Sequence, residues 1–139
     1  MTDDGGIGRL QRRLAAIPKA VKDATQPALR KQGETMVGTM RRFVPKETRD
    51  LEYSIKYTMA GNQTPAYSQP GGSMTVPENA VAITVGNTDV RYGHLVEYGT
   101  TKMQAQPYFW PAVRLHNKKS RQAIKRAVAT AVKKNWGKP

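Results

Sequence analysis

The first 44 residues carry apolar side chains at every third or fourth position, a spacing that predicts helices. A short helix is expected over about residues 7–16, where Leu10, Leu14 and Ile17 fall on one face.

A second helix is expected from Pro18 to Val44. Pro18 suits the first turn of a helix, where its missing N–H costs nothing. Pro27 lies inside the segment and should kink or restart the helix, because a straight helix through a proline costs about 3 kcal/mol. Pro45 should end the helix, since it biases Val44 toward an extended conformation.

Two segments in the middle of the chain alternate apolar and polar residues, which is typical of strands. They are Leu51–Met59 and Asn79–Gly86. Between them, Ala60–Pro77 is rich in Gly, Pro, Gln, Ser and Thr, and loops of this length are usually functional or disordered. We expect an antiparallel pair of strands with a long flexible loop (60–77) at its tip.

The last helix is expected from Phe109 onward. Its apolar residues fall within about a third of the helical circumference: Phe109, Val113, Ile124, Ala127, Val128 and Ala131. Most of its basic residues lie on the opposite arc: Arg114, Lys118, Arg121, Lys125, Arg126 and Lys133. We expect this amphipathic helix to pack on the sheet through the aromatic cluster 108–110, with residues 135–139 as a frayed tail.

Together these elements predict one α/β (α+β) domain over residues 1–139. Leu, Ile, Val and Phe make up only 24 of the 139 residues, so the core is small and neighbouring subunits should complete it. The formal net charge is +13, and from residue 98 onward there are ten basic residues and no acidic one. Such a segment needs an anionic partner when many copies are crowded together.

The sequence favours no enzyme. No apolar run approaches the roughly 20 residues of a membrane span, the polar start is not a secretory signal, and cysteine is absent. These features favour an intracellular protein. His94 and Glu97 would share a helical face, but a metal needs more ligands and only His116 remains. We therefore expect no metal, no cofactor and no catalytic residues.

Two segments carry a family resemblance. One is Val44–Ile55, with the sequence Val-Pro-Lys-Glu-Thr-Arg-Asp-Leu-Glu-Tyr-Ser-Ile. The other is Tyr92–Ala112, which contains Val-Glu-Tyr-Gly-Thr, then Met-Gln-Ala-Gln-Pro-Tyr-Phe-Trp and Pro-Ala. In this order and spacing they resemble the tail-completion (tail-terminator, head–tail joining) proteins of long-tailed, lambda-like phages. That family usually has glycine where this chain has Arg49, so the turn there is expected to differ.

The resemblance implies an α/β virion protein without enzymatic activity. It would assemble in the host cytoplasm into a ring, generally hexameric, that caps the tail tube and joins it to the head connector. The expected ring-interface residues are Glu97, Tyr98, Thr100, Met103, Phe109 and Trp110. The expected partner-docking residues are Lys118, Arg121 and Lys125 on the last helix and Gln63, Tyr67 and Gln69 on the loop.

Two points stay open at this stage. Glu97 can pair with a basic side chain, within the subunit or across the ring, or it can face solvent. The basic helix can dock on acidic protein, which specific joining favours, or contact DNA in the channel. A basic, non-specific DNA-binding protein of phage or bacterial chromatin is the alternative function.

Overall fold

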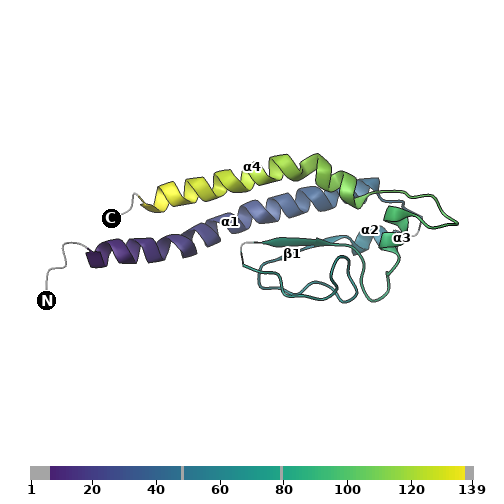
Figure 1. The fold of residues 1–139 in the computed structure, drawn as a ribbon, viewed down its shortest axis with the longest axis horizontal. Coiled ribbons are helices and arrows are strands. Elements are labelled where there is room, and N and C mark those ends of the chain that lie inside the picture. Colours follow the sequence, from purple (N-terminus) through teal and green to yellow (C-terminus); the bar gives the residue numbers. More distant parts are fainter. Residues whose placement is uncertain (1–6, 48, 79, 137–139) are drawn as a thin grey trace.

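The computed structural model describes residues 7–47, 49–78 and 80–136. Two long helices, α1 (Ile7–Phe43) and α4 (Phe109–Trp136), run side by side in opposite directions along the longest axis (Figure 1). We call them the helix pair. Partly buried hydrogen bonds link them: Ser120 Oγ donates to Gln32 Oε1 (2.8 Å), and Thr39 Oγ1 lies 2.7 Å from His116 Nε2. Among the described residues, none of the helices is both long and apolar enough to span a membrane.

Helix α1 is continuous, so the predicted break after residue 16 and a restart of the helix at Pro27 are both wrong, while the kink at Pro27 stays a prediction. Pro27 and Asp23, whose carbonyl loses its i+4 partner, are both exposed, so water can satisfy that carbonyl. Thr25 and Leu29 on either side of Pro27 are buried. Packing against α4 thus offsets the cost of the proline. The helix ends at Phe43, as Pro45 predicts.

The central segment differs from its predicted strand. Helix α2 (Asp50–Ser54) comes first and strand β1 (Lys56–Met59) follows, because Leu51, Ser54 and Ile55 are the buried residues and their spacing is helical. Strand β2 (Val81–Thr84) is shorter than expected and pairs with β1, with Lys56 opposite Thr84. The predicted antiparallel pair is therefore confirmed.

The sheet packs on the C-terminal half of α1, and Gly33 makes this possible. A Cβ atom at Gly33 would lie 3.1 Å from Tyr57 Cβ and 3.2 Å from Val81 Cγ2. Such contacts are tighter than side chains normally make, so the missing side chain is what lets the two strands approach the helix. A glycine that weakens the helix thus serves the packing of the sheet.

The core lies where the end of α1, helix α2, the end of β2 and the start of α4 meet. Its buried members are Val37, Met40, Val44, Leu51, Ile55, Val85, Val90, Tyr108, Phe109 and Ala112. Only the beginning of α4 takes part, and the rest of α4 lies along α1 rather than on the sheet. The α+β class is confirmed, and Tyr108 and Phe109 anchor the start of α4 in the core beside Tyr57 and Ile83 of the sheet, whereas most of α4 packs on α1 instead of on the sheet.

The loop after β1 is hydrogen-bonded along much of its length. It forms an isolated antiparallel bridge between Gln63 and Thr75, and a second one joins Gln69 to Val85 beyond β2. Thr64, Ser68 and Val76 are buried. The loop therefore folds back on the end of the sheet; its flexibility in solution stays a prediction. Of the predicted frayed tail, residues 137–139 lie outside the described residues, and α4 continues through Trp136.

Candidate assembly interface

Glu97 joins the short helix α3 (Gly93–Tyr98) to the start of α4. Its side chain is only 6% exposed, and it accepts three backbone hydrogen bonds. Tyr108 N (2.7 Å) and Phe109 N (3.0 Å) donate to Oε2, and Trp110 N (3.0 Å) donates to Oε1. A carboxylate at a helix N-terminus satisfies otherwise unpaired N–H groups and complements the helix dipole. Neither a basic partner nor open solvent, the two expected surroundings, describes this residue.

Tyr108, just before α4, also connects α3 to the start of α4. Its ring is fully buried, and its hydroxyl donates to the Gly93 carbonyl oxygen at 3.0 Å. Burial, with a smaller contribution from the Glu97 charge, raises the pKa of Tyr108 well above its usual range. A Cβ atom at Gly93 would lie 2.8 Å from the tyrosine hydroxyl oxygen, so this position requires glycine.

Gly99 ends α3 with a sharp turn. Its φ is +76°, and its N–H donates to the Leu95 carbonyl oxygen at 2.8 Å. A Cβ atom there would lie 2.7 Å from Ala105 N. The turn sends residues 100–107 outward before the chain returns to α4 (Figure 1).

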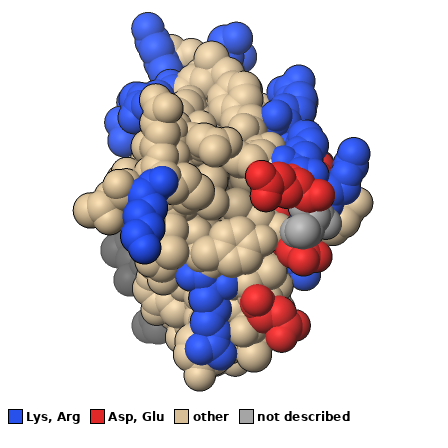
Figure 2. All heavy atoms as spheres, turned by 90° about the vertical axis from the view of Figure 1, so that its right-hand side faces the viewer, with Lys and Arg blue, Asp and Glu red and all other residues tan. Residues whose placement is uncertain are grey.

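Large apolar side chains remain exposed at this end of the molecule. They form what we call the apolar end surface: Tyr92, Leu95, Tyr98, Met103 and Trp110. Tyr98 is 68% exposed and Trp110 is 42% exposed, and Trp110 Nε1 donates to Tyr98 Oη at 2.7 Å. Figure 2 looks onto this end, where residues other than Lys, Arg, Asp and Glu fill the middle and charged side chains lie toward the margins.

The two segments that carry the family resemblance meet here. A pocket between them is lined by Pro45, Glu47, Arg49 and Leu51 from the first, and by Tyr92, Val96, Met103 and Gln106 from the second. A second, mostly apolar pocket lies between α3, the start of α4 and the loop, and its lining includes Gln69, Pro70, His94, Tyr98 and Trp110. Segments distant in sequence thus build one surface.

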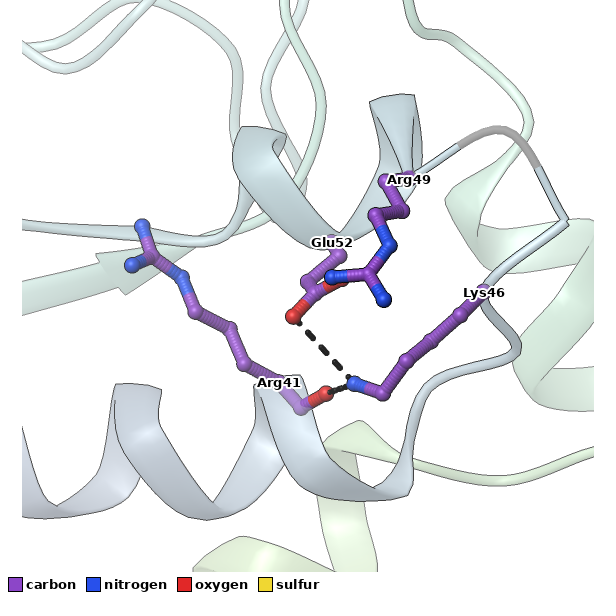
Figure 3. Close-up of polar contacts among 4 residues, drawn as sticks. All are labelled: Arg41, Lys46, Arg49 and Glu52. Atoms are coloured by element: carbon purple, nitrogen blue, oxygen red, sulfur yellow. Dashed lines mark hydrogen bonds and ion pairs between the residues drawn. The ribbon is translucent and has the colours of Figure 1, made fainter.

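A polar cluster fixes the first segment (Figure 3). Lys46 Nζ contacts the Arg41 carbonyl oxygen and donates to Glu52 Oε1 at 3.2 Å. Arg49 Nη1 lies 3.9 Å from Glu52 Oε2. Arg41 Nη2 donates to the Ile55 carbonyl oxygen at 2.7 Å. These contacts attach α2 to the end of α1.

Arg49 adopts φ 65° and ψ 0°, the left-handed conformation that glycine adopts freely. The turn therefore has a glycine-type backbone although its residue is arginine, and the expected difference from the family's turn stays a prediction. The ion pair with Glu52 offsets part of the conformational cost.

The structure separates the expected site residues into groups. Tyr98, Thr100, Met103 and Trp110 are exposed at or beside the apolar end surface, whereas Glu97 and Phe109 lie beneath it. Gln63, Tyr67 and Gln69 are exposed on the loop, where the Arg91 guanidinium lies 3.7 Å from the Tyr67 ring centre. Lys118, Arg121 and Lys125 are exposed on α4.

Sequence reasoning missed Tyr53, Tyr92 and Leu95 as exposed side chains. Tyr53 lies in the segment 51–59 that was predicted as a strand, and the structure places it in helix α2. Tyr92 and Leu95 carried a weak signal, because they lie six and three residues before Tyr98 and so share a helical face with it. His94 is exposed while Glu97 points inward, and no cluster of three metal-ligating side chains exists among the described residues.

These features define a class: a small α+β subunit whose apolar end suits contact with other protein chains. The particular family follows from comparison with known proteins. Residues 8–99 match the family described as "Bacteriophage HK97-gp10, putative tail-component". The match covers well over half of the chain, so the protein belongs to this HK97-gp10-like family of phage tail components. The resemblance to tail-completion proteins is thereby confirmed at the level of the family. Neither the curated proteins nor the solved structures yielded a match.

Proposed function

We propose that this tail protein forms a ring that terminates the tail tube and joins it to the head-side connector. The ring is hexameric, assembles in the host cytoplasm and stays in the neck of the virion. One observation carries the proposal: both segments of the resemblance meet at one end of the subunit and expose an apolar surface there. Exposed patches of this kind mark sites of protein contact.

The ring contact is made by Tyr98, Met103 and Trp110, with Thr100 in the adjoining turn. Large aromatic side chains contribute most to binding at protein interfaces. Glu97 and Phe109 support the contact from beneath, because Glu97 holds the start of α4 in place and Phe109 lies in the core. A ring requires a heterologous contact, so this surface meets a different surface on the neighbouring subunit.

The loop contacts the adjacent layer, either the tail tube or the connector. Tyr67 projects from it with 56% of its surface exposed, and Arg91 holds its ring. Gln69 lies in the same pocket as Tyr98, so the loop borders the ring contact. Tyr67→Ala should leave the number of subunits in the ring unchanged while reducing the attachment of the ring to purified tail tubes.

The assembly is tested by native mass measurement, alone and with tail-tube protein. A double variant, Tyr98→Ala with Trp110→Ala, should remain a single subunit under conditions in which the wild type forms rings. The matched control is Leu115→Ala with Val132→Ala, which removes two exposed apolar side chains from α4 and should still form rings. A wild type that stays monomeric with tail-tube protein present, or a double variant that still assembles, would contradict the proposal.

A further inference from the structure

The charge of the protein is concentrated in the helix pair. Helix α1 contains nine Lys and Arg against two Asp and Glu, and α4 contains eight against none. Residues 44–108, which we call the sheet lobe, contain five basic and six acidic residues. The formal charge of +13 is therefore a property of the two long helices and not of the lobe.

One face of α4 carries a regular row of cations: Arg114, Lys118, Arg121 and Lys125. Steps of four, three and four residues keep this row within about 60° of the helix circumference and spread it over about 16 Å. All four side chains are exposed. The row lines a shallow hollow along α4, together with Asn117, Gln122 and Ile124.

No carboxylate within the subunit neutralises this row in the part of the chain that the structure describes. The ion pairs found there are Lys22–Glu78, Lys46–Glu52 and Arg49–Glu52, and none involves α4. Like charges at this spacing destabilise a helix by a few tenths of a kcal/mol for each pair. The counter-charge must come from outside the subunit.

The chemistry of this face favours phosphate over protein. Protein interfaces have an apolar centre and are poor in lysine. Among the α4 side chains that the structure describes, the large exposed apolar ones beyond Trp110 are Leu115, beside the row, and Val132, on the same arc but seven residues past Lys125. A phosphate backbone needs no apolar anchor, because its affinity comes from counterions that basic side chains displace. The apolar end surface, in contrast, has the composition of a protein contact.

We propose that the row Arg114, Lys118, Arg121 and Lys125 binds the phosphate backbone of duplex DNA without sequence preference. Lysine and arginine position a protein on phosphates without reading bases. The proposal goes beyond the structural role in the neck, and it does not depend on ring formation, because all four side chains belong to one helix of one subunit.

The test is binding of the full chain to a labelled duplex of roughly 20 base pairs, a length that exceeds the row. Fluorescence anisotropy is measured at several salt concentrations. The double variant Lys118→Gln with Lys125→Gln should reduce the slope of log K against log salt by about 2. Near 0.1 M salt its affinity should fall roughly 50-fold, because each displaced counterion contributes a factor of about eight at that concentration.

The matched control, Lys56→Gln with Lys102→Gln, removes the same charge from exposed positions of the sheet lobe. It should leave the salt slope within about half a unit of the wild type. Equal losses in both double variants would mean a diffuse charge effect and would overturn the proposal. An α4 variant that keeps its duplex affinity but no longer joins tails to heads would overturn it in favour of an acidic protein partner.

Native mass measurement on the same samples separates this proposal from the ring. If rings form but do not bind DNA, only the proposal of DNA binding by the row is refuted. If single subunits bind DNA, only the proposal of ring assembly is refuted. Circular dichroism confirms that the α4 variant is folded, as expected when like-charge repulsion is reduced.

Discussion

The sheet lobe and the helix pair differ in their charge and in their contribution to the core. The lobe has nearly balanced charge, contributes much of the core and places both segments of the family resemblance at one apolar end. The helix pair has 17 basic and two acidic residues, a formal charge of +15, on a long scaffold. The family match ends at Gly99, so α4 lies outside it. The two proposals follow this difference: protein contact at the apolar end surface and phosphate contact along α4.

The largest predicted loss of stability comes from removing the Glu97 side chain, which connects the sheet lobe to the helix pair. Glu97→Ala should lower the free energy of unfolding by about 3 kcal/mol, because three buried N–H groups at the start of α4 lose a charged acceptor. Urea denaturation followed by circular dichroism measures this loss. Glu97→Gln keeps an acceptor oxygen and should lose less. A loss below about 1 kcal/mol for the alanine variant would show that the cap is not what holds the helix pair to the lobe.

Two glycines offer a matched test of how tightly each region is packed. Gly93→Ala should destabilise the lobe by about 2 kcal/mol, because the new Cβ atom would lie 2.8 Å from the Tyr108 hydroxyl oxygen. Gly38→Ala should stabilise α1 by about 1 kcal/mol, since nothing lies within 4 Å of its new Cβ atom and alanine favours helix. Thermal melting measures the change in melting temperature of each variant. Changes of the same sign in both would contradict the expected difference in packing.

Tyr108 makes the lobe sensitive to high pH. Above pH 10 the unfolded chain ionises this tyrosine at its ordinary pKa, whereas the folded protein keeps the proton because burial raises the pKa. The unfolded state then binds fewer protons, so the free energy of unfolding falls as pH rises, by up to about 1.4 kcal/mol per pH unit. Tyr108→Phe lacks this contribution. Denaturation of both proteins between about pH 10 and 11 should give slopes that differ, and parallel slopes would contradict the prediction.

The smallest effect is a gain in stability. Arg49→Gly should raise the free energy of unfolding by about 0.5–1 kcal/mol, because glycine removes the cost of a left-handed residue. The lost ion pair with Glu52 is partly exposed and offsets little of the gain. Arg49→Ala loses the ion pair but keeps the strain, so its midpoint in urea should fall. If the glycine variant fell as well, the ion pair would outweigh the backbone conformation.

The spacing of apolar residues predicted the parts of the fold that depend on local sequence. The amphipathic α4 and the pairing of two strands follow from the spacing of apolar residues, and the structure confirms them. The segment 51–55 was misassigned because alternating and helical spacing overlap over so few residues. Both prolines in α1 were read as breaks because sequence alone does not show a partner helix.

The candidate site was only partly visible in the sequence. Exposed Tyr98, Met103 and Trp110 were named in advance, but the position of Glu97 was not, because its partners are backbone N–H groups that every residue carries. The apolar stripe of α4 likewise identifies a face that must be covered without identifying what covers it. That partner is α1, which lies beside α4 in space but is separated from it in the sequence by all the residues of the sheet lobe.

This separation has a consequence for synthesis on the ribosome. The hydrogen bond between Gln32 and Ser120 joins residues 88 positions apart, so α1 emerges first and its partner helix last. At roughly 5–20 residues per second, the apolar face of α1 waits about 4–18 s before α4 covers it. During that interval the nascent chain exposes one long amphipathic helix with nine cations, which makes α1 the segment that a chaperone would meet first.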